Sequence, residues 1–209
     1  MIISQRAFDL IVAEETGGEA YYNKTEQSAD WPGGASGVTI GIGYDCGYET
    51  RASIAADWGG KLPDAQVSEL CSVAGIHGSP AHAHAEELHN VIDVPWAVAL
   101  DVFASRDVPK WEKIVQDALP DSEHLPADSF GALVSLAFNR GASFHEPGPR
   151  YAEMRDIATL MEARRFAEIP MQIRSMARLW PGTKDLRDRR QHEAALFEEG
   201  LKHNSASPE

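Results

Sequence analysis

The arrangement of apolar and polar positions changes twice along the chain. From residue 3 to about residue 15, apolar side chains recur at helical spacing, with Phe8, Ile11 and Val12 at i, i+3 and i+4. A serine suited to capping precedes this stretch, and two consecutive glycines end it. The sequence therefore predicts an amphipathic helix near the start of the chain.

Between Tyr21 and Tyr48 the helical spacing is lost, and aromatic residues alternate with glycine. Glycine inside a strand-like run marks a bend or a place where another group approaches the backbone. Four such glycines are Gly37, Gly41, Gly43 and Gly47. This segment predicts an irregular β-hairpin or small sheet that forms one wall of a substrate cleft.

From residue 50 onward the pattern is helical again, interrupted by Pro, Gly and Asp. The predicted helices cover residues 50–58, 63–75, 80–89, 95–105, 109–118, 126–140, 150–165, 166–178 and 185–200. One helix, a small β element and a helical bundle predict an α+β fold that is predominantly α, with a cleft between the β element and the bundle. We expect a single domain over residues 1–202, with lobes at 1–60 and 61–202, and a disordered tail at 203–209.

Composition and charge narrow the possible partners. The 209 residues are 43% hydrophobic and 24% charged, which suits one globular domain. The net charge of −13 argues against binding to nucleic acid, which needs a positive field. The chain has no long apolar run and no signal peptide at its start, so we expect synthesis in the cytoplasm without membrane insertion. Cys46 and Cys71 are predicted to be free thiols.

The first candidate for chemistry is the pair Glu14 and Glu15 at the end of the first helix. At 100° per residue, Glu15 falls on the face formed by Phe8, Ile11 and Val12, whereas Glu14 points to the side. Partial desolvation there would raise the pKa of Glu15 and suit it to donate a proton near neutral pH. The alternative is a helix-end glutamate that curls into solvent.

The second candidate lies in the glycine-rich run. If the strand bends at Gly41 and Gly43, Thr39 and Asp45 face one cavity, where a hydroxyl can hold a water and a carboxylate can activate it. Two carboxyl groups that flank a bond, one as acid and one serving a water, are the arrangement of glycoside hydrolysis. The alternative is a glycine-rich turn in which Asp45 is a cap.

Four segments in sequential order resemble the phage-type lysozyme family, most closely its pesticin-like branch. They are Glu15 followed by Tyr22, the hairpin GVTIGIGYD (37–45), the helix ALVSLAFNRG (132–141) and the closing helix LRDRRQHEAALF (186–197). The resemblance implies a lysozyme-like fold and a muramidase that hydrolyses the β-1,4 bond between N-acetylmuramic acid and N-acetylglucosamine, without metal or cofactor. It implies Glu15 as general acid, Asp45 as second carboxylate and Thr39 as the residue that holds the attacking water.

The chain departs from that family at three places: Glu14 stands where an aromatic residue is usual, Thr16 replaces a glycine, and Asn23 and Lys24 occupy the place of a common aspartate. Asp45 is our candidate for the carboxylate missing there.

Further residues are candidates for substrate binding. Tyr22, Trp31 and Tyr44 have rings that can stack on sugars, although each can equally be a packing residue. Asn139 can hydrogen-bond an N-acetyl group or cap its helix. Arg189 and Arg190, with Glu193 and Asp188, have the spacing of structural ion pairs. Four histidines suggest a metal, but they lack metal-ligand spacing, and solvated side chains are the simpler interpretation. They are His77, His82, His84 and His89.

Three other functions compete with the muramidase: a chitinase or chitosanase on the same scaffold, a module that binds wall glycan without cutting it, and, more remotely, a metal-binding protein. As a muramidase the protein is expected to be a monomer that reaches peptidoglycan through a holin or a secretion system. A phage endolysin and a delivered toxin both fit the sequence, and a toxin implies an immunity protein.

Overall fold

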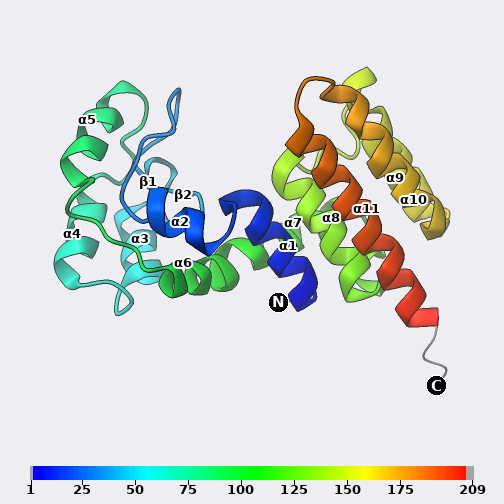
Figure 1. Ribbon diagram of the computed structural model, residues 1–209, viewed down its shortest axis with the longest axis horizontal. Coiled ribbons are helices and arrows are strands. Elements are labelled where there is room, and N and C mark those ends of the chain that lie inside the picture. Colours follow the sequence, from blue (N-terminus) through cyan, green and yellow to red (C-terminus); the bar gives the residue numbers. More distant parts are fainter. Residues whose placement is uncertain (1, 206–209) are drawn as a thin grey trace. The chain divides into compact units, whose positions relative to one another are not determined.

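The computed structural model describes residues 2–205, with side chains to residue 203. Helices account for 68% of the chain, beside a single two-stranded antiparallel sheet in the described residues (Figure 1). The predicted α+β class with a predominance of helix is therefore confirmed. Among residues 2–205, no helix combines the length and the apolar character needed to cross a membrane.

The chain forms two compact units. One unit is Val12–Asp107, and the other joins the residues up to Ile11 to those from Val108 onward. The chain passes between the two units at 11/12 and at 107/108, and the lobes expected at 1–60 and 61–202 stay a prediction. Of the expected tail, residues 203–205 continue the last helix and 206–209 lie outside the described residues.

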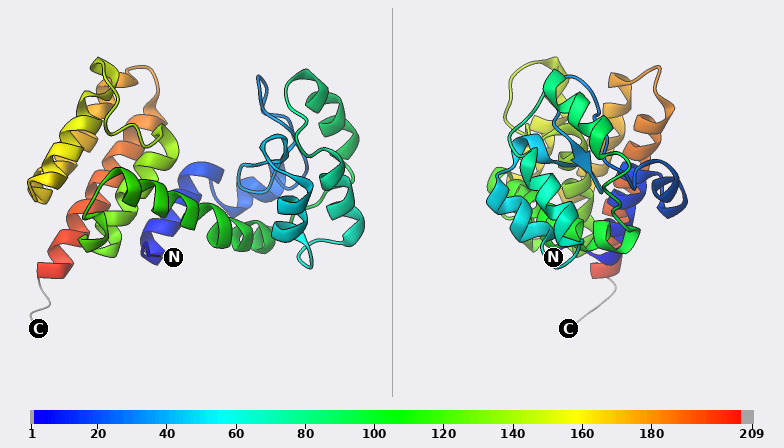
Figure 2. Two further views of the ribbon diagram at one scale, coloured as in Figure 1. Left: turned by 180° about the vertical axis from the view of Figure 1, so that it is seen from behind. Right: turned by 90° about the vertical axis from the view of Figure 1, so that its left-hand side faces the viewer.

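The unit Val12–Asp107 holds the hairpin among short helices. Its elements after α1 (Gln5–Thr16) are α2 (Glu19–Thr25), β1 (Thr39–Ile40), β2 (Tyr44–Asp45), η1 (Cys46–Tyr48), α3 (Arg51–Trp58), α4 (Asp64–Ser72), α5 (Ser79–Leu88), α6 (Trp96–Val102) and η2 (Phe103–Asp107). Figures 1 and 2 show α4 and α5 on the side of the hairpin away from α2. The sequence did not predict α2, because its seven residues bury only Tyr22 and show no apolar stripe.

The other unit is a helical bundle. Its elements are α7 (Val108–Ala118), η3 (Ser122–His124), α8 (Ala127–Arg140), η4 (Pro149–Tyr151), α9 (Ala152–Glu162), η5 (Phe166–Glu168), α10 (Ile169–Ser175), η6 (Met176–Leu179) and α11 (Lys184–Ser205). Helix α8 is its centre: every residue from Ser129 to Ala137 is buried, and α11 packs along it. The helix predicted at 166–178 is instead three short helical segments around Pro170.

A buried ionic cluster joins α8 to α11. The Glu193 carboxylate lies 3.1 Å from Arg189 Nε and 2.8 Å from Arg190 Nε, and it accepts a hydrogen bond of 2.8 Å from the Ser135 hydroxyl. Arg189 also donates to the Ser135 carbonyl oxygen at 3.1 Å. A buried charge needs such partners, and removal of one leaves the other uncompensated. The predicted structural role of these ion pairs is confirmed.

Candidate functional site

The glycine-rich run forms the predicted hairpin. Thr39 pairs with Asp45 and Ile40 with Tyr44, across a turn at residues 41–43. Gly41 has φ +56°, a conformation that side chains disfavour, and a Cβ there would lie 3.1 Å from the Trp58 ring. The bend needed to expose one face of the hairpin therefore depends on glycine.

A third segment extends the pairing beyond the two named strands. Asp30 forms an antiparallel bridge with Thr39, in which the Asp30 N–H donates to the Thr39 carbonyl at 3.0 Å and the reverse bond measures 2.8 Å. Residues opposite each other in antiparallel strands project from the same face. Asp30, Thr39 and Asp45 thus form a row on one face, with the hydroxyl between two carboxylates.

The Asp45 carboxylate binds backbone. The Gly37 N–H donates to its two oxygens at 2.9 and 3.1 Å, and the Gly47 N–H donates at 2.8 Å, which caps η1. A Cβ on Gly37 would lie 2.3 Å from Gly47 N, so the two glycines allow the backbones to meet around this carboxylate. The capping alternative for Asp45 thus has direct geometric support.

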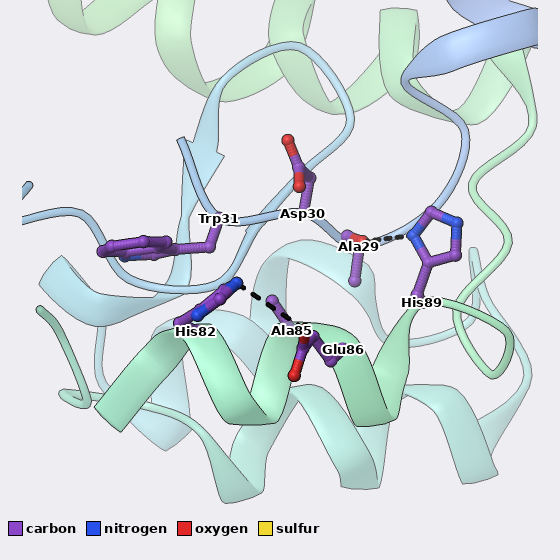
Figure 3. A pocket seen from close by; sticks show the side chains of 7 residues that line it. All are labelled: Ala29, Asp30, Trp31, His82, Ala85, Glu86 and His89. Carbon is purple, nitrogen blue, oxygen red and sulfur yellow. Dashed lines mark hydrogen bonds and ion pairs between the residues drawn. The ribbon is translucent and has the colours of Figure 1, made fainter. Parts of the chain in front are cut away.

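The Asp30 carboxylate, in contrast to that of Asp45, does not bind backbone in the described residues. Asp30 is exposed, and within the described residues its carboxylate accepts no hydrogen bond. In Figure 3 the carboxylate points away from helix α5. Beside it, the half-buried Thr39 hydroxyl makes a long bond of 3.4 Å to the Gly37 carbonyl, which leaves its oxygen available to accept. A carboxylate and a hydroxyl in this relation can hold a water between them.

Glu15 lies in the last turn of α1 and belongs to the same unit as Asp30 and Thr39. Thr16 ends the helix: its hydroxyl donates to the Val12 carbonyl at 2.7 Å and accepts from the Gly18 N–H at 3.1 Å. Glu14 and Glu15 are both half-buried. The helical-face argument predicts that Glu15 is more buried than Glu14. The structure shows both in the same burial class.

Two of the predicted sugar-stacking rings belong to the core. Tyr22 is fully buried, its hydroxyl donates to the Val94 carbonyl at 3.0 Å, and its ring packs against Trp96. Tyr44 is 2% exposed, and its hydroxyl donates to Asp57 at 2.8 Å. Burial raises the pKa of both phenols, and for Tyr44 the hydrogen bond to Asp57 adds to it. Neither ring is accessible to a ligand.

Tyr44 fixes the hairpin to the helix that closes this unit. The Arg106 guanidinium stacks on the Tyr44 ring at 4.3 Å and pairs with Asp57 at 2.9 Å, with Asp107 at 2.7 Å and with Glu49. Arg106 lies in η2, a π-helical turn that directs its side chain toward the hairpin. The row that contains Thr39 is thus held on a rigid support.

Trp31 does not belong to the row of Asp30, Thr39 and Asp45. Its ring lies over His82 of α5, with centroids 4.8 Å apart, at the edge of a hollow of about 130 Å³ (Figure 3). The hollow lies between the segment Ala29–Trp31 and α5, and its lining includes Glu86 and His89. Asn139 is exposed near the end of α8 in the other unit.

The four histidines each have a different neighbour. His77 stacks on Tyr48, His82 and His84 approach Glu86 and Glu87 at 3.8 and 3.5 Å, and His89 Nδ1 lies 3.0 Å from the Ala29 carbonyl. In the part of the chain with described side chains, the one group with metal-ligand spacing is on an exposed turn. It consists of Asp121, Glu123 and His124. Exposed acidic groups of this kind are common without a metal.

The chain matches no protein-family model and no curated protein. Sequence reasoning overlooked Asp30, because we sought the second carboxylate directly after Tyr22 or after the hairpin. The signal available was an aspartate before a turn-forming Pro-Gly-Gly, since such a loop can return the chain to pair with Thr39.

Proposed function

We propose that this protein is a glycoside hydrolase that cleaves the β-1,4 bond between N-acetylmuramic acid and N-acetylglucosamine in peptidoglycan. The observation that carries the proposal is the direct pairing of Asp30 with Thr39, which puts an unengaged carboxylate beside a hydroxyl in the unit that also holds Glu15. An acid and a carboxylate that serves a water are what this reaction requires.

In the proposed mechanism, Glu15 protonates the glycosidic oxygen as the bond to the anomeric carbon breaks with oxocarbenium character. A water held by the Thr39 hydroxyl attacks the anomeric carbon, and the Asp30 carboxylate orients that water and accepts its proton. We assign this second role to Asp30 instead of Asp45, because the Asp45 oxygens already accept three backbone hydrogen bonds.

The test is to digest purified peptidoglycan with the full chain and identify the sugar at each new reducing end. N-acetylmuramic acid is the expected product. N-acetylglucosamine would assign a different bond, and cleavage of chitin oligomers with an intact wall would favour a chitinase. Binding of the wall with no new reducing ends would leave a glycan-binding module. The delivery route, the immunity protein and the monomeric state stay predictions.

A further inference from the structure

Two aromatic rings flank the loop of residues 32–36, which connects Asp30 and Trp31 to the hairpin. The Trp31 indole N–H donates to the Ser36 carbonyl at 2.9 Å, and the Tyr48 hydroxyl donates to the Ala35 carbonyl at 3.1 Å. Both rings therefore have their polar atoms bound to backbone of the same loop. The indole N–H has no further hydrogen bond to make, and the phenol has used its one donor.

A histidine supports each ring from one side. Trp31 and His82 have centroids 4.8 Å apart at 34°, and Tyr48 and His77 are nearly parallel, with centroids 5.8 Å apart at 9°. His77 is itself fixed, because its backbone forms a bridge with Gly37. Rings held at one face and one edge are preorganised, so a ligand that stacks on the second face orders little that was free.

The Tyr48 ring presents its carbon surface to solvent. Its residue is 66% exposed, the largest fraction among the exposed large hydrophobic residues of the described chain. Single exposed hydrophobic residues are common on protein surfaces, so what sets Tyr48 apart is that His77 and the Ala35 carbonyl hold its ring in place. Trp31 is half-buried and borders the hollow against α5. Its ring therefore lies in a recess, whereas the Tyr48 ring lies on the open surface.

The spacing of the two rings limits the ligand. Because Ala35 and Ser36 are consecutive, their carbonyl oxygens are a few ångströms apart, and the two ring polar atoms lie within roughly 12 Å of each other. A ligand of about two sugar units is therefore long enough to reach both rings.

The charge around the rings excludes polyanions. The segments 27–50 and 76–89, which supply both rings and both histidines, contain no Lys or Arg, and the chain carries a net charge of −13. Nucleic acid and other phosphate polymers need a positive field. Aromatic faces with nearby carboxylates and imidazoles instead suit a polymer of sugar rings, which have a C–H face and hydroxyl donors.

We propose that Trp31 and Tyr48 form a second glycan-binding surface, which holds a neighbouring stretch of an aminosugar polymer. It adjoins the row of Asp30, Thr39 and Asp45, because Trp31 follows Asp30 and both residues border the hollow against α5. Figure 3 shows their side chains diverging from the shared segment. The surface rests on the proposed function for the identity of its ligand, an insoluble wall polysaccharide.

The experiment measures binding of the full chain to purified insoluble sacculi by sedimentation. All proteins carry Glu15→Gln, so that the wall is not consumed. We expect Tyr48→Ala to weaken binding five- to tenfold, and Tyr48→Phe, which keeps the ring, to stay within twofold. Tyr21→Ala is the matched control, because Tyr21 is also an exposed tyrosine, at 54%, in the same unit but on helix α2. It should bind within twofold of its parent.

Equal binding by the Tyr48→Ala and parent proteins, with both melting at the same temperature, would overturn the surface. Equal losses in Tyr48→Ala and Tyr21→Ala would overturn it as well. Failure of the proposed function is seen separately, as an absence of new reducing ends when the protein with Glu15 digests the same sacculi. Sedimentation does not depend on that result. Stacking is checked directly by titrating an N-acetylglucosamine hexamer and following the Trp31 indole N–H signal by NMR, where no shift contradicts the proposal.

Discussion

The two segments that pair with Thr39 differ in what surrounds their carboxylates. On one side, Asp45 accepts hydrogen bonds from Gly37 and Gly47 and caps a helical turn. On the other side, the Asp30 carboxylate is exposed and accepts no hydrogen bond from the described residues. The same residue type thus has two uses within one row: the enclosed carboxylate stabilises the fold, and the open one is available for chemistry.

The largest expected effect concerns Glu15, the acid that would protonate the glycosidic oxygen. Glu15→Gln removes the proton donor and should lower kcat on peptidoglycan by roughly a thousandfold, within the usual range for a general acid. The melting temperature should stay within about 2 °C, since the glutamine keeps the shape of the side chain. The control is Glu14→Gln, with activity within about threefold. A reversal of the two results would assign the acid to Glu14.

The next largest effect on activity is expected for the exposed Asp30 carboxylate. Asp30→Asn should lower kcat/KM by about a hundredfold, because an amide cannot accept the proton of the attacking water. Its free energy of unfolding should change by less than about 0.5 kcal/mol, as for other surface substitutions. Dye-release kinetics on labelled sacculi and urea denaturation give the two numbers. Full activity in Asp30→Asn would return the second carboxylate to Asp45.

For the Asp45 carboxylate we expect the reverse, a loss of stability with little loss of activity. In Asp45→Asn an amide NH₂ faces backbone N–H donors, and hydrogen bonds to a charged acceptor contribute about 1.5–3 kcal/mol. We expect the free energy of unfolding to fall by about 2 kcal/mol. At a temperature where the variant is fully folded, kcat/KM should lie within about threefold of the parent. An inactive but stable variant would contradict this assignment.

A smaller effect is expected at the hydroxyl between the two carboxylates. Thr39→Val keeps the shape and removes one hydrogen bond to the water, for a loss of about tenfold in kcat/KM. Thr39→Ser restores a hydroxyl and should recover most of that activity. Steady-state kinetics on soluble wall fragments distinguish the two variants, and equal activities would show that the methyl group, and not the oxygen, matters.

The smallest effect is a pH dependence of stability beside the hairpin. Burial raises the pKa of the Cys46 thiol to about 12, whereas a thiol in the unfolded chain titrates near 8.5. The unfolded state therefore loses its proton first, and stability falls as pH rises above about 8.5, by up to about 1.4 kcal/mol per pH unit. Urea denaturation at pH 8.0 and 9.5 should show this fall in the parent and less of it in Cys46→Ala. Equal slopes would contradict it.

The fold was predictable where periodicity carries information. The helices at 50–58, 109–118 and 126–140 differ from α3, α7 and α8 by at most one residue at each end. The hairpin was predictable from glycines that its turn requires. Helix α2 was not, because it buries one side chain, and the unit division at 107/108 depends on long-range packing that no local pattern shows.

The sequence indicated which residue types belong to the candidate site, but not which groups surround each of them. Thr39 pairs with Asp45 in the hairpin, but the pattern could not show that Gly37 and Gly47 converge on the Asp45 carboxylate. Nor could it show that Asp30, nine positions before Thr39, pairs with Thr39. Tyr22 and Tyr44 have the ring chemistry for sugars, yet burial withdraws both from solvent, and burial is a tertiary property.

The loop between Asp30 and Gly37 is anchored at both ends by bonds outside itself, on one side by the pairing with Thr39 and on the other by the Asp45 carboxylate. Changes in its length or sequence therefore leave the spacing of the three-residue row intact. Under the proposed function, changes in this loop would therefore alter glycan binding and leave Asp30, Thr39 and Asp45 in place.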